Sequence, residues 1–282
     1  STLLDTETFS TTATYDALGR PVTQTTHDGS ITRYAYNAAG LLESVEVDIR
    51  GATPSTTIVS DIDYDVHGRR RSVAHGNGTT TAYTYDPVTF WLTRIRTTRD
   101  SGGDVVQDLQ YVYDPVGNVV EIQDGATQTE YFANAVVEPH QQFAYDALYR
   151  LVSATGREHV SQGQPTSSEL TPGSQPETSD PAAMRRYTET YAYDAVGNLL
   201  THQHVASGGN WTRQYVYATA GNRLLQTSAP GDPAAGPYSH DYEYDAHGNM
   251  TVMPHLAAID WDALDRMQHA DLGGGGDVYF QY

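Results

Sequence analysis

"YDALGR" occupies residues 15–20, and closely similar six-residue stretches recur along the chain. They read "YDVHGR" from Tyr64, "YDPVGN" from Tyr113, "YDALYR" from Tyr145, "YDAVGN" from Tyr193 and "YDAHGN" from Tyr244. A catalytic motif normally occurs once, whereas self-similarity at this frequency is typical of repeat architectures. We therefore interpret the stretch as a structural unit.

The aromatic residue that opens each unit shows how regular the repeat is. The series runs Tyr15, Tyr36, Tyr64, Tyr85, Tyr113, Tyr145, Tyr193, Tyr217, Tyr244 and Trp261, and a further interval of 21 reaches Tyr282. The shorter intervals of 21 to 28 residues accommodate two strands of about seven residues and two turns. The chain is therefore expected to end inside a unit.

The composition of each unit predicts a tight turn. Asp or Asn at the second position can bond the backbone two residues on, and Gly at the fifth accepts positive φ without strain. Where Gly is replaced, as at Tyr149 and Asp265, a different turn or strain is expected. The residues that we assign to these turns are Tyr15, Asp16, Gly19, Tyr36, Asn37, Gly40, Tyr64, Asp65, Gly68, Tyr85, Asp86, Tyr113, Asp114, Gly117, Tyr145, Asp146, Tyr193, Asp194, Gly197, Tyr217, Gly221, Tyr244, Asp245, Gly248, Trp261 and Asp262.

Strand-like runs flank the turns. Aromatic-x-Tyr triplets such as 34–36 and 191–193 precede them, and residues two apart in a strand face the same side of a sheet. Hairpin signals such as Asp28-Gly29 and Asp124-Gly125 lie between the units. The sequence therefore predicts an all-β fold, in which tandem antiparallel hairpins form a long, curled β-sheet strip.

Helices fit the sequence poorly, because the chain has 25 Gly and 13 Pro. One short helix is predicted at 180–186, where Asp stands as N-cap and Pro follows it. It falls in a long loop excursion at about 156–187, which is rich in Pro, Ser, Thr and Gln. The domain prediction is one repeat region over 1–282, a fragment of a larger shell.

The predicted number of strands constrains the shape. Ten units give about twenty strands, which at roughly 4.8 Å each would extend on the order of 95 Å. An open twisted sheet seldom exceeds about ten strands without curling. The strip is therefore expected to coil, close or wrap something. Its two end strands are open edges, which invite pairing with the rest of a parent protein or with further copies.

Composition excludes several classes of function. The net charge is −19 and all 16 basic residues are Arg, so the basic patch that nucleic-acid binding requires is not expected. There is no Cys, which excludes disulfides and Cys-based zinc sites. No apolar run approaches the roughly 18 residues of a membrane span, and no signal peptide is recognisable at Ser1.

The tandem "YDxxGR" and "YDxxGN" units resemble the YD-repeat, or Rhs-repeat, proteins. These include polymorphic Rhs toxins, the B and C components of insecticidal toxin complexes, and teneurins. The stretches 145–159, 183–198 and 238–256, with Trp261 and "LGGGG" at 272–276, look most like the B component. The resemblance implies an arc of a hollow β-shell that encloses a toxin polypeptide. It also implies a secreted or extracellular location. The family's autoprotease signature has no counterpart in the chain, so no catalytic residue is carried over.

Other candidate sites have simpler structural explanations. His202-x-His204 places two imidazoles on one strand face but lacks an evident third zinc ligand. The cluster 157–159 could be an acid/base group, but no nucleophile accompanies it. The glycines 273–276 lack the Lys and Ser/Thr of a phosphate loop. Repeated Asp and Tyr could bind metal, sugar or bases, but turn formation and packing explain them. We therefore expect no catalytic residue, metal or cofactor.

Three functions remain. The first is a structural shell segment that encapsulates a toxin or other polypeptide cargo, with a Tyr-rich, acidic inner wall. The second is an extracellular repeat module for adhesion or glycan binding. The third, an enzyme, has no sequence support beyond isolated polar residues.

Overall fold

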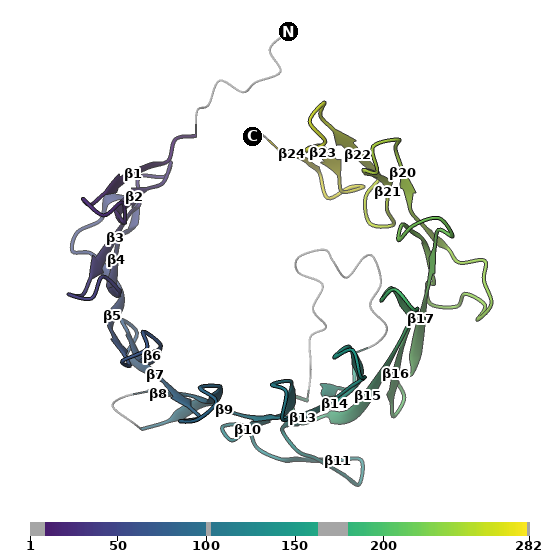
Figure 1. Cartoon of the computed structure of the whole chain (residues 1–282), viewed down its shortest axis with the longest axis horizontal. Coiled ribbons are helices and arrows are strands. Elements are labelled where there is room, and N and C mark those ends of the chain that lie inside the picture. The colour runs from purple at the N-terminus through teal and green to yellow at the C-terminus, as the bar shows by residue number, and fades with distance from the viewer. Residues whose placement is uncertain (1–8, 100–102, 163–179, 281–282) are drawn as a thin grey trace. The chain divides into compact units, whose positions relative to one another are not determined.

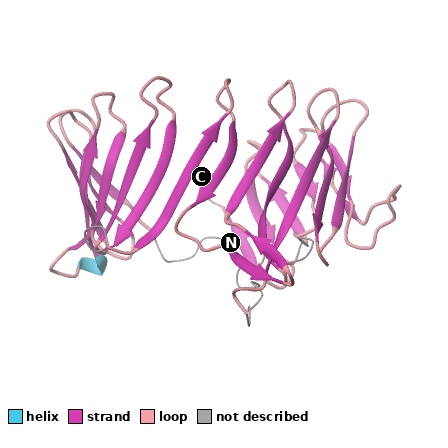
Figure 2. Cartoon of the chain, turned by 90° about the horizontal axis from the view of Figure 1, so that it is seen from below, coloured by secondary structure: helices cyan, strands magenta, loops and turns pink. Residues whose placement is uncertain are grey.

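We analysed a computed structural model of the chain, which describes residues 9–99, 103–162 and 180–280. The contacts divide the chain into two compact segments, an N-terminal segment Ser1–Thr127 and a C-terminal segment Gln128–Tyr282, and each is described by itself. The described residues form 24 strands and one short 3-10 helix, and Figure 2 shows the strands side by side, joined by turns at both ends. The all-β prediction is confirmed.

The N-terminal segment is a ten-stranded antiparallel meander, in which each strand pairs with the next one along the chain (Figure 1). The 3-10 helix η1 (Ile49–Gly51) interrupts the connection between two of its strands. The strands are β1 (Thr12–Tyr15), β2 (Pro21–Thr25), β3 (Ile31–Tyr36), β4 (Leu42–Asp48), β5 (Thr56–Tyr64), β6 (Arg70–His75), β7 (Thr79–Tyr85), β8 (Leu92–Arg99), β9 (Val105–Tyr113) and β10 (Val119–Asp124).

The C-terminal segment contains a seven-stranded meander and smaller sheets. The first two strands pair as a hairpin, the next seven pair in chain order, and the last five form a two-stranded and a three-stranded sheet. The strands are β11 (Glu130–Phe132), β12 (Ala135–Val137), β13 (His140–Tyr145), β14 (Leu151–His159), β15 (Met184–Tyr193), β16 (Leu199–Ala206), β17 (Trp211–Tyr217), β18 (Leu224–Thr227), β19 (His240–Asp241), β20 (Glu243–Tyr244), β21 (Met250–Val252), β22 (Ala258–Trp261), β23 (Met267–Asp271) and β24 (Asp277–Tyr279).

The aromatic-x-Tyr triplets alternate between the two faces, as predicted. Tyr34 and Tyr36 are half-buried, whereas Ala35 between them is exposed. The same pattern holds at 191–193 and 215–217. Each pair of rings therefore lies on one face of its sheet, which is the consequence of the two-residue period of a strand.

A β-bulge lies at the opening aromatic of nearly every unit. Ala35 pairs with Ser44 but Tyr36 pairs with Leu42, so Glu43 has no partner. The same shift occurs before Tyr64 and Tyr193. A bulge bends its strand and increases the local twist. Each such unit therefore contains a bend in its strand, which the sequence analysis did not predict.

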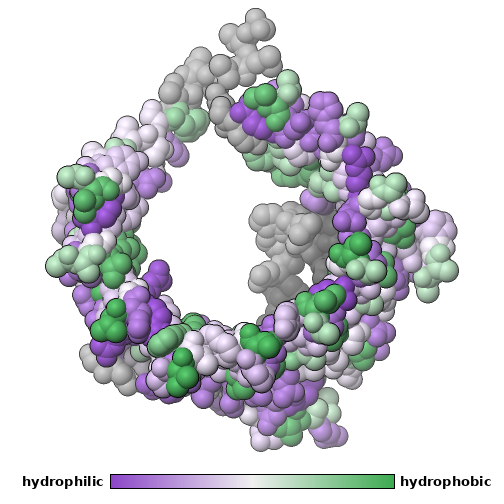
Figure 3. Space-filling model, viewed as in Figure 1, coloured by the Kyte–Doolittle hydropathy of each residue, from purple (hydrophilic) through white to green (hydrophobic). Residues whose placement is uncertain are grey.

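The interior is thin, as a single-layer sheet requires. The buried apolar residues of the described chain are Ile62, Val73, Val137, Ala154, Ala183, Ala206, Ile259 and Ala270, while seven polar residues are equally buried. Leu and Val at the turn tips are exposed, including Leu18, Val88, Val116, Leu148, Val196 and Leu264. Figure 3 shows small apolar patches separated by polar ones on the face in view. The turn tips do not contribute to a core.

Three local predictions are wrong. The helix predicted at 180–186 is a turn at 181–182 followed by β15. The excursion predicted at 156–187 is shorter, because β14 continues to His159 and pairs with β15 from Met184. The ladder of seven residue pairs outweighs a weak local helix signal. Asp124-Gly125 ends β10 without forming a hairpin to the next strand, whose partner is β12. The middle of the excursion, 163–179, lies outside the described residues.

Candidate functional site

The first candidate site is the repeated turn itself, and the turn at Asp16 shows its geometry. The N–H of Asp16 donates to the carbonyl of Arg20 at 2.9 Å, and the N–H of Gly19 donates to the carbonyl of Asp16 at 3.0 Å. The Asp16 Oδ1 accepts from the N–H groups of Leu18 and Arg20 at 2.9 and 3.0 Å. Gly19 has φ 75°. One carboxylate oxygen and one glycine therefore close the turn.

The same contacts recur at the other units. Asn37 replaces Asp without loss of the two backbone bonds, since its Oδ1 accepts from Ala39 and Leu41, each at 3.0 Å. Six more turns have an aspartate Oδ1 that accepts from the backbone N–H groups of the fourth and sixth residues of the unit, at Asp65, Asp114, Asp146, Asp194, Asp245 and Asp262.

The sixth residue, Arg or Asn, has a role that sequence reasoning missed. The Nε of Arg20 donates to Asp16 Oδ2 at 2.7 Å, and the guanidinium lies 4.3 Å from the ring centroid of Tyr36. The equivalent stack of Arg69 over Tyr85 is also 4.3 Å. Each Arg therefore joins its own turn to the aromatic of the next unit through a cation–π contact.

The opening aromatic also ties consecutive units together. The hydroxyl of Tyr36 donates to the carbonyl of Pro21 at 2.8 Å, and that of Tyr64 donates to the carbonyl of Leu42 at 2.7 Å. The Nε1 of Trp261 donates to the carbonyl of Met250 at 2.8 Å. A signal for this bond was present in the sequence, because every opening aromatic is Tyr or Trp and none is Phe. Only the first two carry a donor on the ring.

Where glycine is replaced, the same turn persists with strain. Tyr149 has φ 62° and its N–H still donates to the carbonyl of Asp146 at 3.0 Å. Asp265 has φ 59° and donates to the carbonyl of Asp262 at 3.1 Å. At the Tyr85 unit the turn is one residue longer, and Phe90 takes the positive φ of 64°. Left-handed backbone at residues other than Gly costs energy, so the flanking ladders hold these turns in place.

Hydrogen bonding keeps the turn aspartates ionised. Burial favours the neutral form of Asp65, but bonds from the side chain and backbone of Arg69 outweigh it and lower its pKa to about 2. For Asp16 the backbone N–H of Arg20 is the main cause of a lowered pKa. These carboxylates are therefore structural acceptors at neutral pH, and they carry no proton to donate in catalysis.

The second candidate site is a polar cluster on one face of β14–β17. The Arg185 Nε donates to Glu158 Oε1 at 2.7 Å, and both side chains are buried. The Nε2 of His204 lies 3.1 Å from the same oxygen, and its Nδ1 lies 3.3 Å from Glu189 Oε1. The hydroxyl of Tyr191 donates to Glu189 Oε2 at 2.6 Å. Three strands therefore contribute to one buried network.

Aromatic stacking closes this cluster. The ring of His204 is stacked on Trp211 at 5.1 Å between centroids, and His202 is stacked on Tyr191 at 4.6 Å. Burial lowers the pKa of His202 and outweighs the nearby Glu189 carboxylate. The two imidazoles thus share a face, as their spacing predicted. Among the residues that the structure describes, however, no group of three or more His, Asp or Glu is placed to hold a metal ion.

The residues of the predicted acid/base group 157–159 do not act together. Arg157 donates to the carbonyl of Gln128, Glu158 joins the buried network, and His159 lies 2.7 Å from Ser161 Oγ. Successive residues of β14 point to opposite faces, so these three side chains cannot converge. The glycine run forms the hairpin between β23 and β24, in which Gly273, Gly274 and Gly276 have positive φ.

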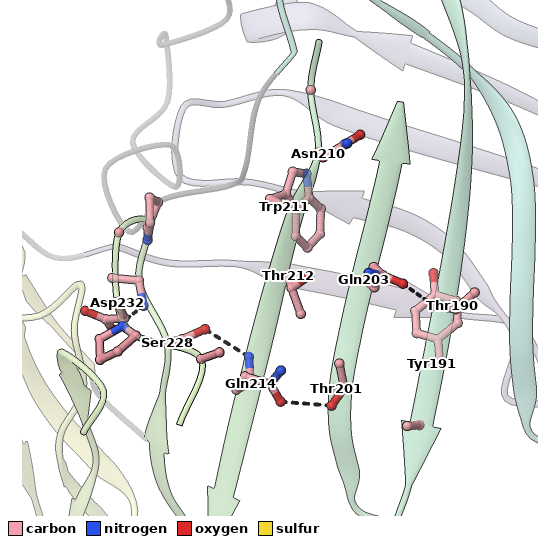
Figure 4. Close-up of a pocket in the computed structure, with 17 residues that line it drawn as sticks. Thr190, Tyr191, Thr201, Gln203, Asn210, Trp211, Thr212, Gln214, Ser228 and Asp232 are labelled. Atoms are coloured by element: carbon pink, nitrogen blue, oxygen red, sulfur yellow. Dashed lines mark hydrogen bonds between the residues drawn. The ribbon is translucent and has the colours of Figure 1, made fainter. Parts of the chain in front are cut away.

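A groove lies beside β17 in the C-terminal segment (Figure 4). Its volume is about 910 Å³, near the upper end of the roughly 300–1,000 Å³ typical of ligand pockets. Side chains of β15, β16 and β17 form its floor, and residues 228–234 form a wall. Sequence reasoning did not find it, because its strands and its loop are distant in the chain. Among the described residues no helix is long and apolar enough to cross a membrane.

Comparisons with known proteins agree with the repeat architecture. The family model described as RHS Repeat matches residues 15–53, the first two units. The toxin subunit YenC2 of Yersinia entomophaga is 36% identical over 99% of this chain, and the toxin subunit YenC1 of the same organism is 37% identical over 93%. The chain spans only 29% and 26% of these relatives.

A solved structure carries the resemblance into three dimensions. The crystal structure of TcdB2-TccC3-Cdc42 superposes with a TM-score of 0.77 at 33% identity over 95% of this chain and 12% of the solved one. The sequence resemblance pointed most closely to a B component, whereas the curated relatives are named YenC1 and YenC2. The comparisons therefore agree that the similar proteins are subunits of toxin complexes, and they do not single out the B component. The repeats and the relatives together show that the chain belongs to the Rhs-repeat, or YD-repeat, family.

Proposed function

We propose that the chain is a wall segment of a larger YD-repeat shell that encloses a polypeptide, such as a toxin. The observation that carries this proposal is the single-layer sheet. Domains ordinarily bury one face of a sheet against a second layer. Here the described residues bury only eight apolar side chains, and the two faces remain accessible.

The architecture explains how such a wall stands without a core. Consecutive units are joined by backbone pairing, in several units by the hydroxyl of the opening Tyr, and after turns that end in Arg by the stacked guanidinium. These contacts lie within the sheet, so they need no second layer. A wall built in this way can face a solvent-filled interior on one side and water on the other.

The relatives support the same role. The matched proteins are toxin subunits, and the chain corresponds to a quarter to a third of their length. We assign the chain a structural role, without catalysis of its own, and a place outside the producing cell. Its partners are the remainder of the parent shell, reached through the open edges of the sheet, and the enclosed polypeptide.

Protease protection tests the proposal. The complete protein that contains this chain is digested with proteinase K under native conditions and after the shell has been unfolded in urea. We expect fragments from outside the repeat strip to survive native digestion and to be cleaved once the shell opens. Equal cleavage under both conditions, or an electron microscopy map in which the strip encloses no volume, would contradict the proposal.

A further inference from the structure

Strand β17 is longer than the strand beside it. Only Tyr215, Val216 and Tyr217 pair with β18. The ladder ends one step further on, where the N–H of Ser228 donates to the carbonyl of Gln214 at 3.0 Å and the Ser228 Oγ accepts from the Gln214 N–H at 2.9 Å. Beyond this point the chain leaves the sheet. Within the described part of the chain, the first half of β17 therefore has a neighbouring strand, β16, on one side only.

The backbone of Thr212 faces the open side. Alternate residues of an antiparallel strand direct their N–H and C=O groups to the same side. Gln214 directs both groups toward Ser228, so Thr212, two residues earlier, directs its own toward the groove. Thr212 lies opposite Gln203 in β16, and no strand of the described residues pairs with Thr212 on the groove side. Thr212 thus offers one N–H and one C=O at the open edge, next to the Gln214 pair that Ser228 occupies.

The far wall of the groove is a loop that satisfies its own polar groups. Asp232 Oδ2 accepts from the N–H groups of Ala229 and Ser239 at 2.7 and 2.8 Å, and the Ser239 hydroxyl donates to Asp232 Oδ1. The N–H of Gly236 donates to the carbonyl of Pro233 at 3.0 Å. The loop is therefore held open by bonds within itself, and it does not fold onto the edge of β17.

The floor of the groove is neutral and polar. The Thr201 hydroxyl donates to Gln214 Oε1 at 2.9 Å, and the Thr190 hydroxyl lies 3.4 Å from Gln203 Oε1 (Figure 4). These bonds use the amide oxygens and leave the amide nitrogens directed elsewhere. Among the described residues that line the groove, Asp232 is the one charged residue, and its carboxylate is occupied by the loop. In a chain of net charge −19, this groove is suited to a neutral ligand.

We propose that the groove beside β17 is a strand-addition site, which binds an extended, neutral polypeptide segment of a partner protein through the backbone of Thr212. The added strand would supply a carbonyl to the Thr212 N–H and an N–H to the Thr212 carbonyl. Its side chains on one face would lie beside the Thr and Gln side chains of the floor. Exposed sheet edges bind peptides by this mode, in which the main chain gives affinity.

A carbohydrate fits the groove less well. Sugar recognition commonly uses an exposed aromatic ring, and Trp211 directly precedes Thr212 in β17. Its ring is stacked on His204 and lies edge-to-face with His202, 4.7 Å between centroids. Tyr191 is likewise stacked on His202. Both rings, which belong to the lining, are thus already engaged in stacking, whereas the backbone pair of Thr212 matches a peptide.

The test uses an array of eight-residue peptides composed of Ser, Thr, Asn, Gln, Ala and Val, bound to the intact chain. Thr212→Pro removes the N–H that faces the groove, and it leaves the ladder to β16 intact because that N–H takes no part in it. We expect Thr212→Pro to weaken the best peptides by about tenfold or more, and Thr212→Val, which keeps both backbone groups, to change binding by less than about twofold. Peptide binding should also slow hydrogen exchange of the Thr212 amide.

Each alternative result has a clear meaning. Circular dichroism of Thr212→Pro must match the parent chain, and if it does not, the exchange measurement on the parent chain decides. Peptide binding that Thr212→Pro leaves unchanged overturns the proposal. So does the lack of any binder in the array, or binding of an arrayed glycan that Gln203→Ala abolishes. Since the site lies within the C-terminal segment alone, its failure would leave the proposed shell function untouched.

Discussion

The hydroxyl of Tyr193 donates a hydrogen bond of 2.8 Å to the carbonyl of Leu151, which lies 42 residues earlier in the chain. The guanidinium of Arg150, next to Leu151, lies 4.9 Å from the centroid of the Tyr193 ring and donates to the carbonyl of Asp194 at 3.1 Å. The connection between these two units is the longest in the chain, yet their turns meet as consecutive turns do. The contacts between units therefore depend on strand order, and not on the length of the connection.

Tyr193→Phe should lower the free energy of unfolding by about 0.5–1.5 kcal/mol, because it leaves the Leu151 carbonyl without its donor. Urea unfolding followed by tryptophan fluorescence measures the change. Tyr131→Phe is the matched control, since the Tyr131 side chain is 78% exposed. Its effect should be close to zero, and equal effects of the two substitutions would show that the inter-unit bond contributes nothing.

Tyr149→Gly should stabilise the chain by about 0.5–1 kcal/mol, because relief of the left-handed strain exceeds the entropy that Gly loses on folding. The neighbouring Leu148 is similarly exposed, at 68% against 61% for Tyr149, but it is not in the left-handed region. Leu148→Gly should therefore destabilise the chain. Thermal unfolding of both variants checks the prediction, which fails if they shift the midpoint in the same direction.

Gly156→Ala should destabilise the C-terminal segment by about 1–3 kcal/mol, as overpacking does. A Cβ on Gly156 would lie 2.6 Å from the hydroxyl oxygen and 2.9 Å from Cε1 of Tyr187. The same substitution in a Tyr187→Ala background should be nearly neutral, because the ring is gone. A double-mutant cycle measures this coupling, and additive effects would exclude the ring of Tyr187 as the cause.

Arg185→Met should cost about 3–5 kcal/mol, because it leaves the buried Glu158 without its cation. The side chains of Arg185 and Glu158 are 7% and 9% exposed. Arg185→Met with Glu158→Gln should recover part of the loss. The control is Arg71→Met, whose pair with Asp63 is exposed and is expected to contribute about 0–1 kcal/mol. Chemical denaturation that gave similar losses for the two Arg variants would argue against a buried pair.

Stability should fall as the pH decreases from about 4 toward 2. The pKa of Asp65 is lowered from 3.8 to about 2 in the folded chain, so its contribution is fully present above the unfolded value and is lost as the folded value is reached. Asp65→Asn removes this titration, while Asn37 shows that an amide can still make the two backbone bonds. Unfolding midpoints from pH 2 to 5 should therefore slope less in Asp65→Asn. An unchanged slope would assign the acid sensitivity to other carboxylates.

Much of the fold could be predicted because it depends on short-range contacts. The turn bonds of Asp16 reach only two and four residues along the chain, so the sequence of one unit contains them. The alternation at Tyr34 and Tyr36 follows from the geometry of a single strand. The helix at 180–186 was wrong for the converse reason. Its partner strand lies beyond the excursion, and pairing of Arg185 with Glu158 outweighed the local signal.

The candidate sites were less accessible to sequence reasoning. Glu158 and His204 are 46 residues apart, and only the order of β14, β15 and β16 brings them within 3.1 Å. The groove depends on where β18 stops pairing, which is decided when Ser228 and Asp232 turn the chain out of the sheet. Pro230, Gly231 and Asp232 are poor strand formers and mark the end of the strand locally, but no local pattern shows which residues of β17 are left without a partner.

The sequence by itself determined the period, the turn chemistry, the all-β class and the face on which the tyrosines lie. These properties need only interactions over a few residues, and the backbone imposes them wherever the pattern occurs. The tertiary structure alone decided which hydroxyl meets which carbonyl, which polar groups are buried together and where β17 is left open. Those contacts join strands from different units, so they exist only after the sheet has assembled and the entropy of closing each loop has been overcome.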